Sequence, residues 1–273
     1  MSFDTLGPGG LDYLPCRYGT SRILFRGPRR PLDAPYVAFF GGTTTYGKFI
    51  ERPFPQLIEP DLGVTCINFG CLNGGVDVYA TDPFLREAAT QAAVTVIQVT
   101  SPRNMSNRFY RVHPRRNDRF VEASTLLRTI YAEVDFAEFN FTNHMLKRLH
   151  LLSPDRFNAV LEELRTAWLA RMRLVLSQIP GKTVMLWASK DTPQKAAADM
   201  DSDPAFVTAE MLADIEPLVT RLVRVVASDD ALAMGTDGMV FAEMDAPAAR
   251  TMLGPAVHRE IADALLPVLL ELK

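Results

Sequence analysis

The chain has 273 residues, of which 48% are hydrophobic and 22% charged, a composition typical of a globular protein with a sizeable core. Its formal net charge of −3 argues against a protein that coats nucleic acid. The sequence shows no secretory signal and no apolar run long enough to cross a bilayer, so we expect a cytoplasmic protein without a membrane partner. The unpaired spacing of Cys16, Cys66 and Cys71 indicates buried thiols in a reducing compartment.

Residues 1–35 contain five glycines and five prolines, which predicts an irregular arm. Downstream, five short apolar runs rich in β-branched residues predict the strands of a parallel sheet. They are YVAFF (36–40), VTCINF (64–69), VTVIQV (94–99), TVMLWAS (183–189) and GMVFAE (238–243). Helical patterns separate these runs, and the clearest begins with Ser153 as N-cap and Pro154 in the first turn and stops at Pro180 and Gly181.

The alternation of strands and helices predicts an α/β fold, a three-layer sandwich with a central five-stranded parallel sheet. No repeat or linker divides the chain, so we expect a single domain over residues 1–273 with an insertion at 100–150. Ligands of open parallel sheets bind beyond the carboxyl ends of the strands. We therefore expect the loops after residues 40, 69, 99, 189 and 243 to meet around one cleft.

The turn after the first predicted strand, GGTTTYG, carries the first candidate site. Gly41 and Gly42 permit a tight turn, and Thr43 would expose its hydroxyl at the sheet edge beside backbone N–H groups that suit an oxyanion or a phosphate. Gly42 and Thr44 are therefore candidate ligand-binding residues, together with Asn73 in the next loop. Alternatively, the three threonines only satisfy the turn through side-chain to backbone hydrogen bonds.

The motifs GGTTTYG, PFPQLIEPDLG and INFGCLNGG resemble the opening of SGNH/GDSL-type hydrolases. This resemblance implies a flavodoxin-like strand order and hydrolysis or acyl transfer on an ester. It implies that Thr43 occupies the place of the nucleophilic serine and Gly70 the place of an oxyanion-hole glycine. It further implies that Asn104 or Asn107 takes the place of the asparagine that faces the oxyanion.

Two departures from that family affect the chemistry. Threonine replaces serine, and its extra methyl group crowds nucleophilic attack. The Asp-x-x-His motif of the family is incomplete, because Asp245, the best candidate for the acid, is followed by Ala248 at the histidine position. His258 lies on an apolar helical face and is predicted to be a buried structural residue, whereas His113, which precedes Pro114, is the candidate for a relocated base.

Segment 101–120, SPRNMSNRFYRVHPRRNDRF, concentrates six arginines in a chain of net charge −3. Guanidinium groups bind two oxygens of a phosphate, sulfate or carboxylate at once, so we expect this segment to hold an anionic small molecule or saccharide near the first turn. The alternatives are a solvated basic surface and internal ion pairs, while nucleic acid is disfavoured as a partner. The candidate ligand-binding residues are Arg103, Asn107, Arg108, Arg111, Arg115 and Arg116.

The stretches CRYGTSRILFRGP, GGTTTYG and SNRFYRVHPRRNDRF are also similar to an uncharacterised bacterial domain family of this length, which brings no known activity. No metal-ligand spacing and no glycine-rich nucleotide motif is present, so we expect no cofactor. Three hypotheses remain. The protein is an SGNH-like ester hydrolase or acyltransferase with atypical catalytic residues, a non-catalytic relative that binds an anionic ligand, or a subunit that binds a protein partner through the insertion.

Overall fold

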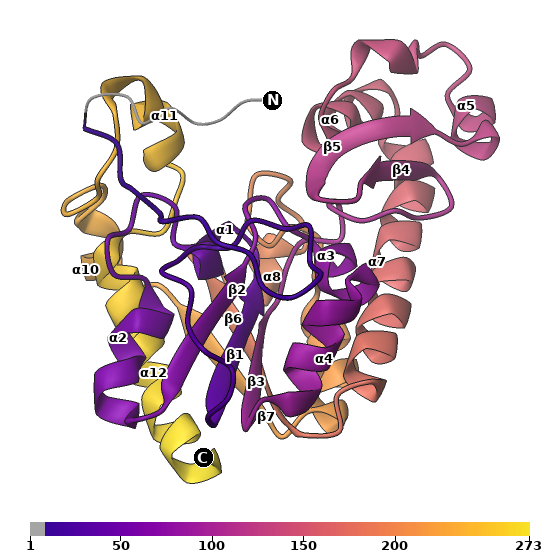
Figure 1. Cartoon of the computed structure of the whole chain (residues 1–273). Helices are drawn as coiled ribbons and strands as arrows, with labels where there is room; N and C mark the ends of the chain where they lie inside the picture. Colours follow the sequence, from indigo (N-terminus) through magenta and orange to yellow (C-terminus); the bar gives the residue numbers. More distant parts are fainter. Residues whose placement is uncertain (1–8) are drawn as a thin grey trace.

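The computed structural model describes residues 9–273, and a five-stranded parallel sheet lies at its centre (Figure 1). The strands of this sheet are β1 (Tyr36–Gly41), β2 (Thr65–Gly70), β3 (Val94–Gln98), β6 (Lys182–Ser189) and β7 (Arg221–Val226). Their spatial order is β2-β1-β3-β6-β7, which is the expected flavodoxin-like order. In this order the connections change direction between β1 and β3, so a ligand cleft is expected where those two strands end.

Helices cover both faces of the sheet because successive strand residues point to opposite sides. Tyr36 and Phe40 of β1 belong to the core on one face, and Val37 and Phe39 to the core on the other. The helices of the first face are α3 (Val76–Thr81), α4 (Pro83–Gln91), α7 (Pro154–Ser177) and α9 (Ala209–Ile215), and η2 (Glu216–Leu218) follows α9. Those of the second face are α2 (Phe54–Leu62) and α12 (Pro255–Leu272). The predicted three-layer sandwich is therefore confirmed.

The prediction of the fifth strand was wrong. Residues 238–243 form no strand and contribute only an isolated bridge between Ile50 and Met239, while β7 pairs with β6 at the sheet edge. The β7 sequence RLVRVV places two arginines among apolar residues and is mostly exposed or half-buried, which suits an edge strand, so it lacks the continuous apolar run used to identify strands. The chain after β7 forms α10 (Asp229–Ala233), η3 (Glu243–Asp245) and α11 (Ala246–Ala249), so Asp245 does not directly follow the last strand.

The insertion between β3 and α7 builds a lobe with its own apolar core (Figure 1). Its elements are the antiparallel hairpin of β4 (Tyr110–His113) and β5 (Arg116–Ala123), then α5 (Thr125–Ile130), η1 (Phe136–Glu138) and α6 (Thr142–Leu152). The apolar stripe seen in the sequence, which comprises Phe136, Phe139, Met145 and Leu149, is buried in this core. These side chains therefore stabilise the lobe together with apolar side chains of the hairpin.

Helix α7 belongs to both cores. Its N-terminal half contributes Phe157 and Leu164 to the core of the lobe, and its C-terminal half contributes Trp168 and Met172 to the core of the sheet. The helix begins as predicted, because the Ser153 hydroxyl accepts a hydrogen bond from the N–H in the first turn. One continuous helix of 24 residues therefore fixes the lobe relative to the sheet.

Asp77 of α3 reinforces this attachment. Its carboxylate accepts a hydrogen bond from Ser106 N at 2.8 Å and forms an ion pair with Arg171 of α7. Burial raises the pKa of the Asp77 carboxyl, so the charged form depends on these two partners. The loop after β3 is thereby tied to α3 and α7.

Cys66 and Cys71 are buried free thiols as predicted, and Cys16 is half-buried.

No helix within residues 9–273 has both the length and the apolar composition that crossing a membrane requires.

His258 is the buried structural histidine that its apolar helical face predicts. Its side chain is only 1% exposed, and Nδ1 accepts a hydrogen bond from Phe54 N at 3.2 Å in the first turn of α2. Burial, with a smaller contribution from Arg26, lowers the pKa of His258 from 6.5 to about 3. The imidazole is therefore neutral in the folded protein and caps α2.

This lowered pKa predicts a pH-dependent stability. The unfolded chain binds a proton on His258 near pH 6.5 and the folded chain only near pH 3, so stability falls as the pH decreases from 6.5 towards 3. Between pH 7.5 and pH 5.0 the wild type should lose about 2 kcal/mol more unfolding free energy than His258→Asn, whose side-chain oxygen can still accept from Phe54 N. Urea unfolding at both pH values measures this difference, and equal losses in the two proteins would contradict it.

Candidate functional site

A buried glutamine holds the turn that follows β1. The chain passes from Gly41 directly into the single-turn helix α1 (Thr43–Tyr46). Gln98 Oε1, at the end of β3, accepts three hydrogen bonds, from Gly42 N at 3.2 Å, Thr45 N at 3.2 Å and Thr45 Oγ1 at 2.7 Å. Because each buried donor left unpaired costs about 1–3 kcal/mol, Gln98 determines the position of this turn.

Two more side chains hold α1 from its other sides. Asn68 of β2 donates from Nδ2 to the Thr45 carbonyl at 2.6 Å and accepts from Gly70 N at 2.9 Å. The buried Arg26 guanidinium donates to the backbone carbonyls of Tyr46, Gly47 and Glu51. The Gly70 N–H, which the hydrolase resemblance assigns to an oxyanion hole, therefore donates to Asn68.

Two positions of this region require glycine because neighbouring atoms approach the backbone closely there. A Cβ on Gly41 would lie 2.2 Å from Thr45 Oγ1 and 2.5 Å from Gln98 Oε1, and a Cβ on Gly70 would lie 2.3 Å from Tyr46 N. Contacts this short would force backbone or buried side chains to move. The two glycines therefore allow α1 to lie directly on the carboxyl ends of β1 and β2.

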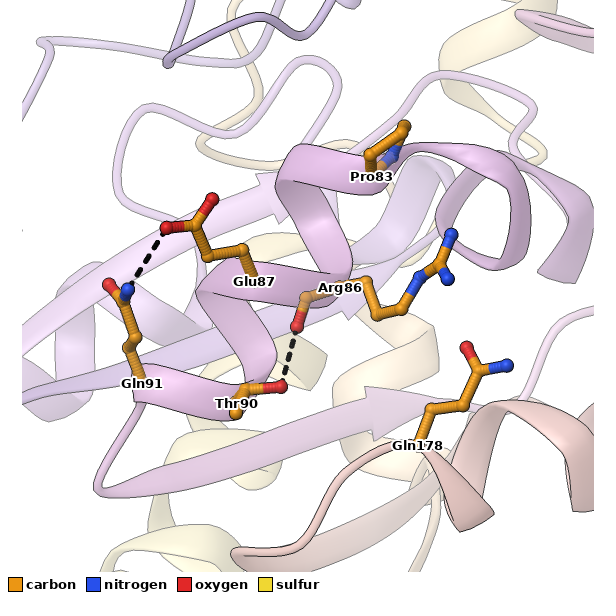
Figure 2. A pocket seen from close by; sticks show the side chains of 6 residues that line it. All are labelled: Pro83, Arg86, Glu87, Thr90, Gln91 and Gln178. Atoms are coloured by element: carbon orange, nitrogen blue, oxygen red, sulfur yellow. Dashed lines mark hydrogen bonds between the residues drawn. The ribbon is translucent and has the colours of Figure 1, made fainter.

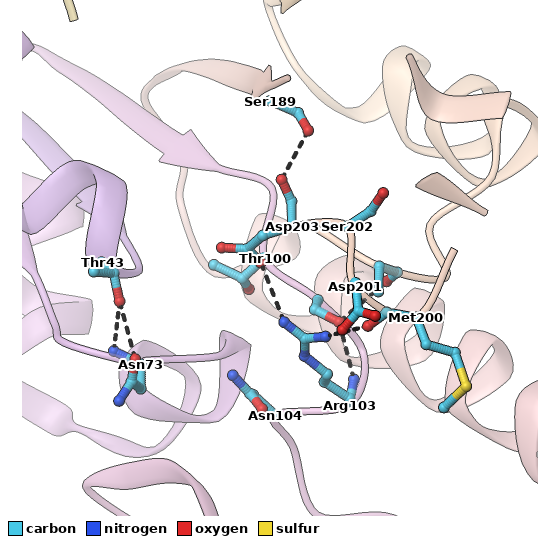
Figure 3. Close-up of polar contacts among 12 residues, drawn as sticks. Thr43, Asn73, Thr100, Arg103, Asn104, Ser189, Met200, Asp201, Ser202 and Asp203 are labelled. Atoms are coloured by element: carbon cyan, nitrogen blue, oxygen red, sulfur yellow. Dashed lines mark hydrogen bonds and ion pairs between the residues drawn. The ribbon is translucent and has the colours of Figure 1, made fainter. Parts of the chain in front are cut away.

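The Thr43 hydroxyl lies at the carboxyl edge of the sheet and bonds to Asn73. Thr43 Oγ1 accepts from Asn73 N at 2.9 Å and lies 3.2 Å from Asn73 Oδ1, to which it donates (Figure 3). Asn73 has φ 54°, a left-handed conformation that asparagine tolerates better than most residues. Its Nδ2 in turn donates to Asp118 Oδ2 at 3.1 Å, so a hydrogen-bonded chain runs from α1 to the β4–β5 hairpin.

The tip of the β4–β5 hairpin, residues 113–118, docks on the loop after β2. Besides the bond from Asn73 to Asp118, Gly75 N donates to Asn117 Oδ1 at 2.9 Å, and the Cys71 thiol lies 3.9 Å from the Arg115 carbonyl. Burial, with Asp118 nearby, raises the pKa of Cys71 to about 12, so this thiol stays protonated and is a poor nucleophile. These contacts hold the hairpin tip beside Thr43.

Asn104, in the loop after β3, joins the same group of residues. Its Oδ1 accepts a hydrogen bond from Thr142 Oγ1 at 3.2 Å, and Thr142 Oγ1 also lies 3.3 Å from the Asp118 carbonyl. A Cβ on Gly75 would lie 1.9 Å from the Asn104 carbonyl, so the loops after β2 and β3 are in backbone contact. Figure 3 shows the Asn104 amide between Asn73 and Arg103, with no partner for its Nδ2 among residues 9–273.

The structure divides the six arginines into two groups. Arg103, Arg108 and Arg111 form ion pairs with Asp203, Glu163 and Glu122 respectively, and Arg119 lies over the Phe141 ring at 4.6 Å. Arg115 and Arg116, at the hairpin tip, are exposed and form no ion pair with any described residue. Ion pairs and ring stacking therefore account for four of the six arginines and leave Arg115 and Arg116 exposed at the hairpin tip.

The other predicted site residues lie as follows. Asn107 accepts from the backbone N–H groups of Phe109 and Tyr110 and so shapes a turn, and His113 Nδ1 accepts from Arg115 N at 3.2 Å. Thr44 is half-buried on α1. Asp245 lies with α11, and Figure 1 shows this segment and the insertion on opposite sides of the molecule.

Three residues of the site were missed by the sequence analysis. Gln98 and Asn68 are polar residues inside otherwise apolar strand runs, and this is the signal that could have identified them. Asp118 is the acidic residue among the arginines, and burial raises the pKa of its carboxyl. Its contact with Asn73 joins positions 45 residues apart, which no local pattern indicates.

A hollow of about 360 Å³ lies along α4 and the end of α7 (Figure 2). Its lining residues on α4 are exposed and bond locally, as Gln91 does to Glu87 and Thr90 to the Arg86 carbonyl. It contains none of the predicted site residues and lies away from the strand ends, so we place the candidate site at Thr43. Within residues 9–273, no group of three or more His, Cys, Asp or Glu residues is arranged to hold a metal ion.

The chain belongs to a protein family described as a domain of unknown function, DUF6473, whose model matches residues 1–273. This confirms the expected similarity to an uncharacterised domain family. No curated protein matches the chain. Neither comparison adds support to the SGNH/GDSL resemblance.

The role of Gln98 predicts a large loss of stability in Gln98→Leu. Three donors of the turn lose their acceptor, so the unfolding free energy should fall by about 3–5 kcal/mol. Thr45→Val, which removes one of the three donors, should cost about 1 kcal/mol, and Gln91→Leu on the exposed face of α4 should change stability by less than about 0.5 kcal/mol. Urea unfolding at neutral pH measures all three, and a Gln98→Leu variant as stable as Gln91→Leu would contradict the assignment.

Proposed function

We propose that this protein is a non-catalytic SGNH-like domain that binds an anionic ligand at the carboxyl ends of β1 and β3. The observation that supports this most directly is the docking of the hairpin tip on the loop after β2. It places residues 115 and 116 next to the loop that carries Asn73, and among the described residues these two arginines, unlike the other four of the segment, neither form an ion pair nor stack on an aromatic ring.

Electrostatics favours an anion at this position. Guanidinium groups bind phosphate, sulfate and carboxylate through paired hydrogen bonds, and their charge does not depend on pH in the usual range. The chain as a whole carries a net charge of −3, whereas Arg115 and Arg116 create a positive electrostatic potential at the hairpin tip. The free N–H of Asn104 Nδ2 adds an uncharged donor nearby.

Thr43 serves in this proposal as a group that orients the ligand. Its hydroxyl already donates to Asn73 Oδ1 and accepts from Asn73 N, and no histidine or carboxylate of residues 9–273 forms a hydrogen bond with it. A threonine hydroxyl without a general base stays protonated and is a weak nucleophile. This favours ligand binding over covalent catalysis.

Ester hydrolysis or acyl transfer is the second candidate, and one observation favours it. Thr43 lies at the strand end where the hydrolase resemblance requires its nucleophile, and Asn104, whose Nδ2 has no partner among the described residues, lies in the loop after β3 where the resemblance requires an oxyanion donor. Among the described residues no hydrogen bond connects His113 or Asp245 to Thr43. A base would have to come from a rearranged hairpin tip.

Anion binding predicts a specific effect of charge reversal at the hairpin tip. Arg115→Glu and Arg116→Glu should each weaken binding of glucose 1-phosphate at least tenfold, or about 1.4 kcal/mol, because each replaces an attractive charge by a repulsive one. Arg148→Glu is the matched control, since Arg148 is exposed on α6 of the same lobe and forms no ion pair with a described residue. Isothermal titration calorimetry at constant ionic strength measures the affinities, and equal effects of all three substitutions would contradict the proposal.

The hydroxyl environment predicts that the protein does not hydrolyse esters. Across a panel of short acyl esters and acylated sugars, the rates with wild type and with Thr43→Ala should agree within about twofold, because nothing activates the hydroxyl. The rate of acid release measures this. Clear wild-type activity that Thr43→Ala abolishes would establish the second candidate instead, and His113→Gln would then be the next variant to examine.

A further inference from the structure

The segment between β7 and α12, residues 227–254, keeps its larger apolar side chains at the surface. No apolar side chain larger than alanine is buried within it. Leu232, Met234 and Met244 are 40%, 50% and 86% exposed. Single exposed apolar residues are ordinary in a folded protein, whereas a segment in which none of them is buried indicates an interaction surface.

The same segment is acidic. It contains no lysine or arginine and five carboxylates, which are those of Asp229, Asp230, Asp237, Glu243 and Asp245. None of the five forms an ion pair or a side-chain hydrogen bond with a described residue. Glu243 and Asp245 flank Met244, the most exposed large apolar side chain of residues 9–273. Residues 227–254, hereafter the acidic segment, therefore present apolar side chains together with unpaired negative charge.

The insertion presents a surface of the complementary kind. Arg119 forms no ion pair with a described residue, lies over the Phe141 ring at 4.6 Å and is joined to Phe141 by a β-bridge. Val121 follows two positions later in β5, and Phe120 between them is buried in the core of the lobe, so Arg119 and Val121 share the outer face of the strand. Phe141 is 43% and Val121 48% exposed. These three residues, the β5 patch, combine exposed apolar side chains with a cation.

The two surfaces leave the same edge of the sheet. The insertion follows the carboxyl end of β3 and the acidic segment follows that of β7, and the strands are parallel. Figure 1 shows them on opposite sides of the molecule, so they lie apart within one chain. A second copy related by a two-fold axis midway between them would bring each acidic segment onto the β5 patch of the other copy, which makes two identical contacts.

We propose that the acidic segment of one copy docks on the β5 patch of a second copy, so that the protein forms a two-fold dimer. Met244 packs on Phe141, since a methionine thioether adapts to uneven surfaces and contacts aromatic rings favourably. The carboxylates that flank Met244 meet the guanidinium of Arg119. A second copy is the partner that the charges favour, because one chain carries both halves of the contact. The inference goes beyond the proposed anion binding and does not depend on it.

The test measures self-association of the full chain by analytical ultracentrifugation. The wild type should be a dimer with a Kd below about 100 μM. Glu243→Arg and Arg119→Glu should each weaken dimerisation at least tenfold, or about 1.4 kcal/mol, because each variant places like charges at both contacts. Asp61→Arg is the matched control, since Asp61 is an exposed carboxylate of α2 without an ion pair to a described residue, and it should leave the Kd unchanged.

Mixing the two variants separates a lost contact from a folding defect. In a mixed dimer, Arg at position 243 of one copy faces Glu at position 119 of the other, and the second contact keeps the wild-type pair of charges. The equimolar mixture should therefore dimerise with a Kd within about threefold of the wild-type value. A variant that is misfolded would not recover on mixing.

Three results would overturn the proposal. A wild type that stays monomeric up to about 100 μM would leave a basic protein of different sequence as the partner of the acidic segment. A dimer that neither variant weakens would form through another face. Variants that dissociate but do not recover when mixed would show that the two surfaces do not meet. Each of these results leaves anion binding at Arg115 and Arg116 to its own test.

Discussion

The three hydrogen bonds that Gln98 Oε1 accepts from the turn after β1 are the interaction on which the candidate site depends. A buried amide at the end of β3 reaches across to the neighbouring strand and replaces the capping side chain that α1 lacks. Such an arrangement is possible only where the backbones approach closely, and Gly41 and Gly70 provide that approach. The position of the Thr43 hydroxyl at the sheet edge therefore follows from packing beneath it.

The insertion brings charged side chains to the loop after β2. Helix α7 anchors it through residues that belong to both cores, and Asp77 ties its first loop to the sheet layer. The hairpin tip, which carries Arg115, Arg116 and Asp118, then docks on the loop after β2. Because the other arginines of the segment are paired or stacked, the basic character of the sequence is concentrated at one position.

The sequence predicted the part of the structure that local patterns determine. Apolar runs located four of the five strands, and the Ser153 cap located α7, because burial and capping act over a few residues. The edge strand β7 escaped the search, since its arginines interrupt the apolar run. At the site, Thr43 and Asn73 could be predicted because each follows a strand. The role of Gln98, the contact of Asp118 with Asn73 and the choice of which arginines are paired could not be predicted, because they depend on residues far apart in the chain.

The measurement that tests the central claim most directly is NMR mapping of glucose 1-phosphate on the isotope-labelled full chain. We predict that the largest shift changes occur at the backbone amide of Thr43, the side-chain amides of Asn73 and Asn104, and the guanidinium groups of Arg115 and Arg116. This pattern would locate the ligand at the carboxyl ends of β1 and β3, beneath the hairpin tip. Changes confined to the hollow at Arg86 and Gln178 (Figure 2), or no changes at saturating ligand, would contradict it.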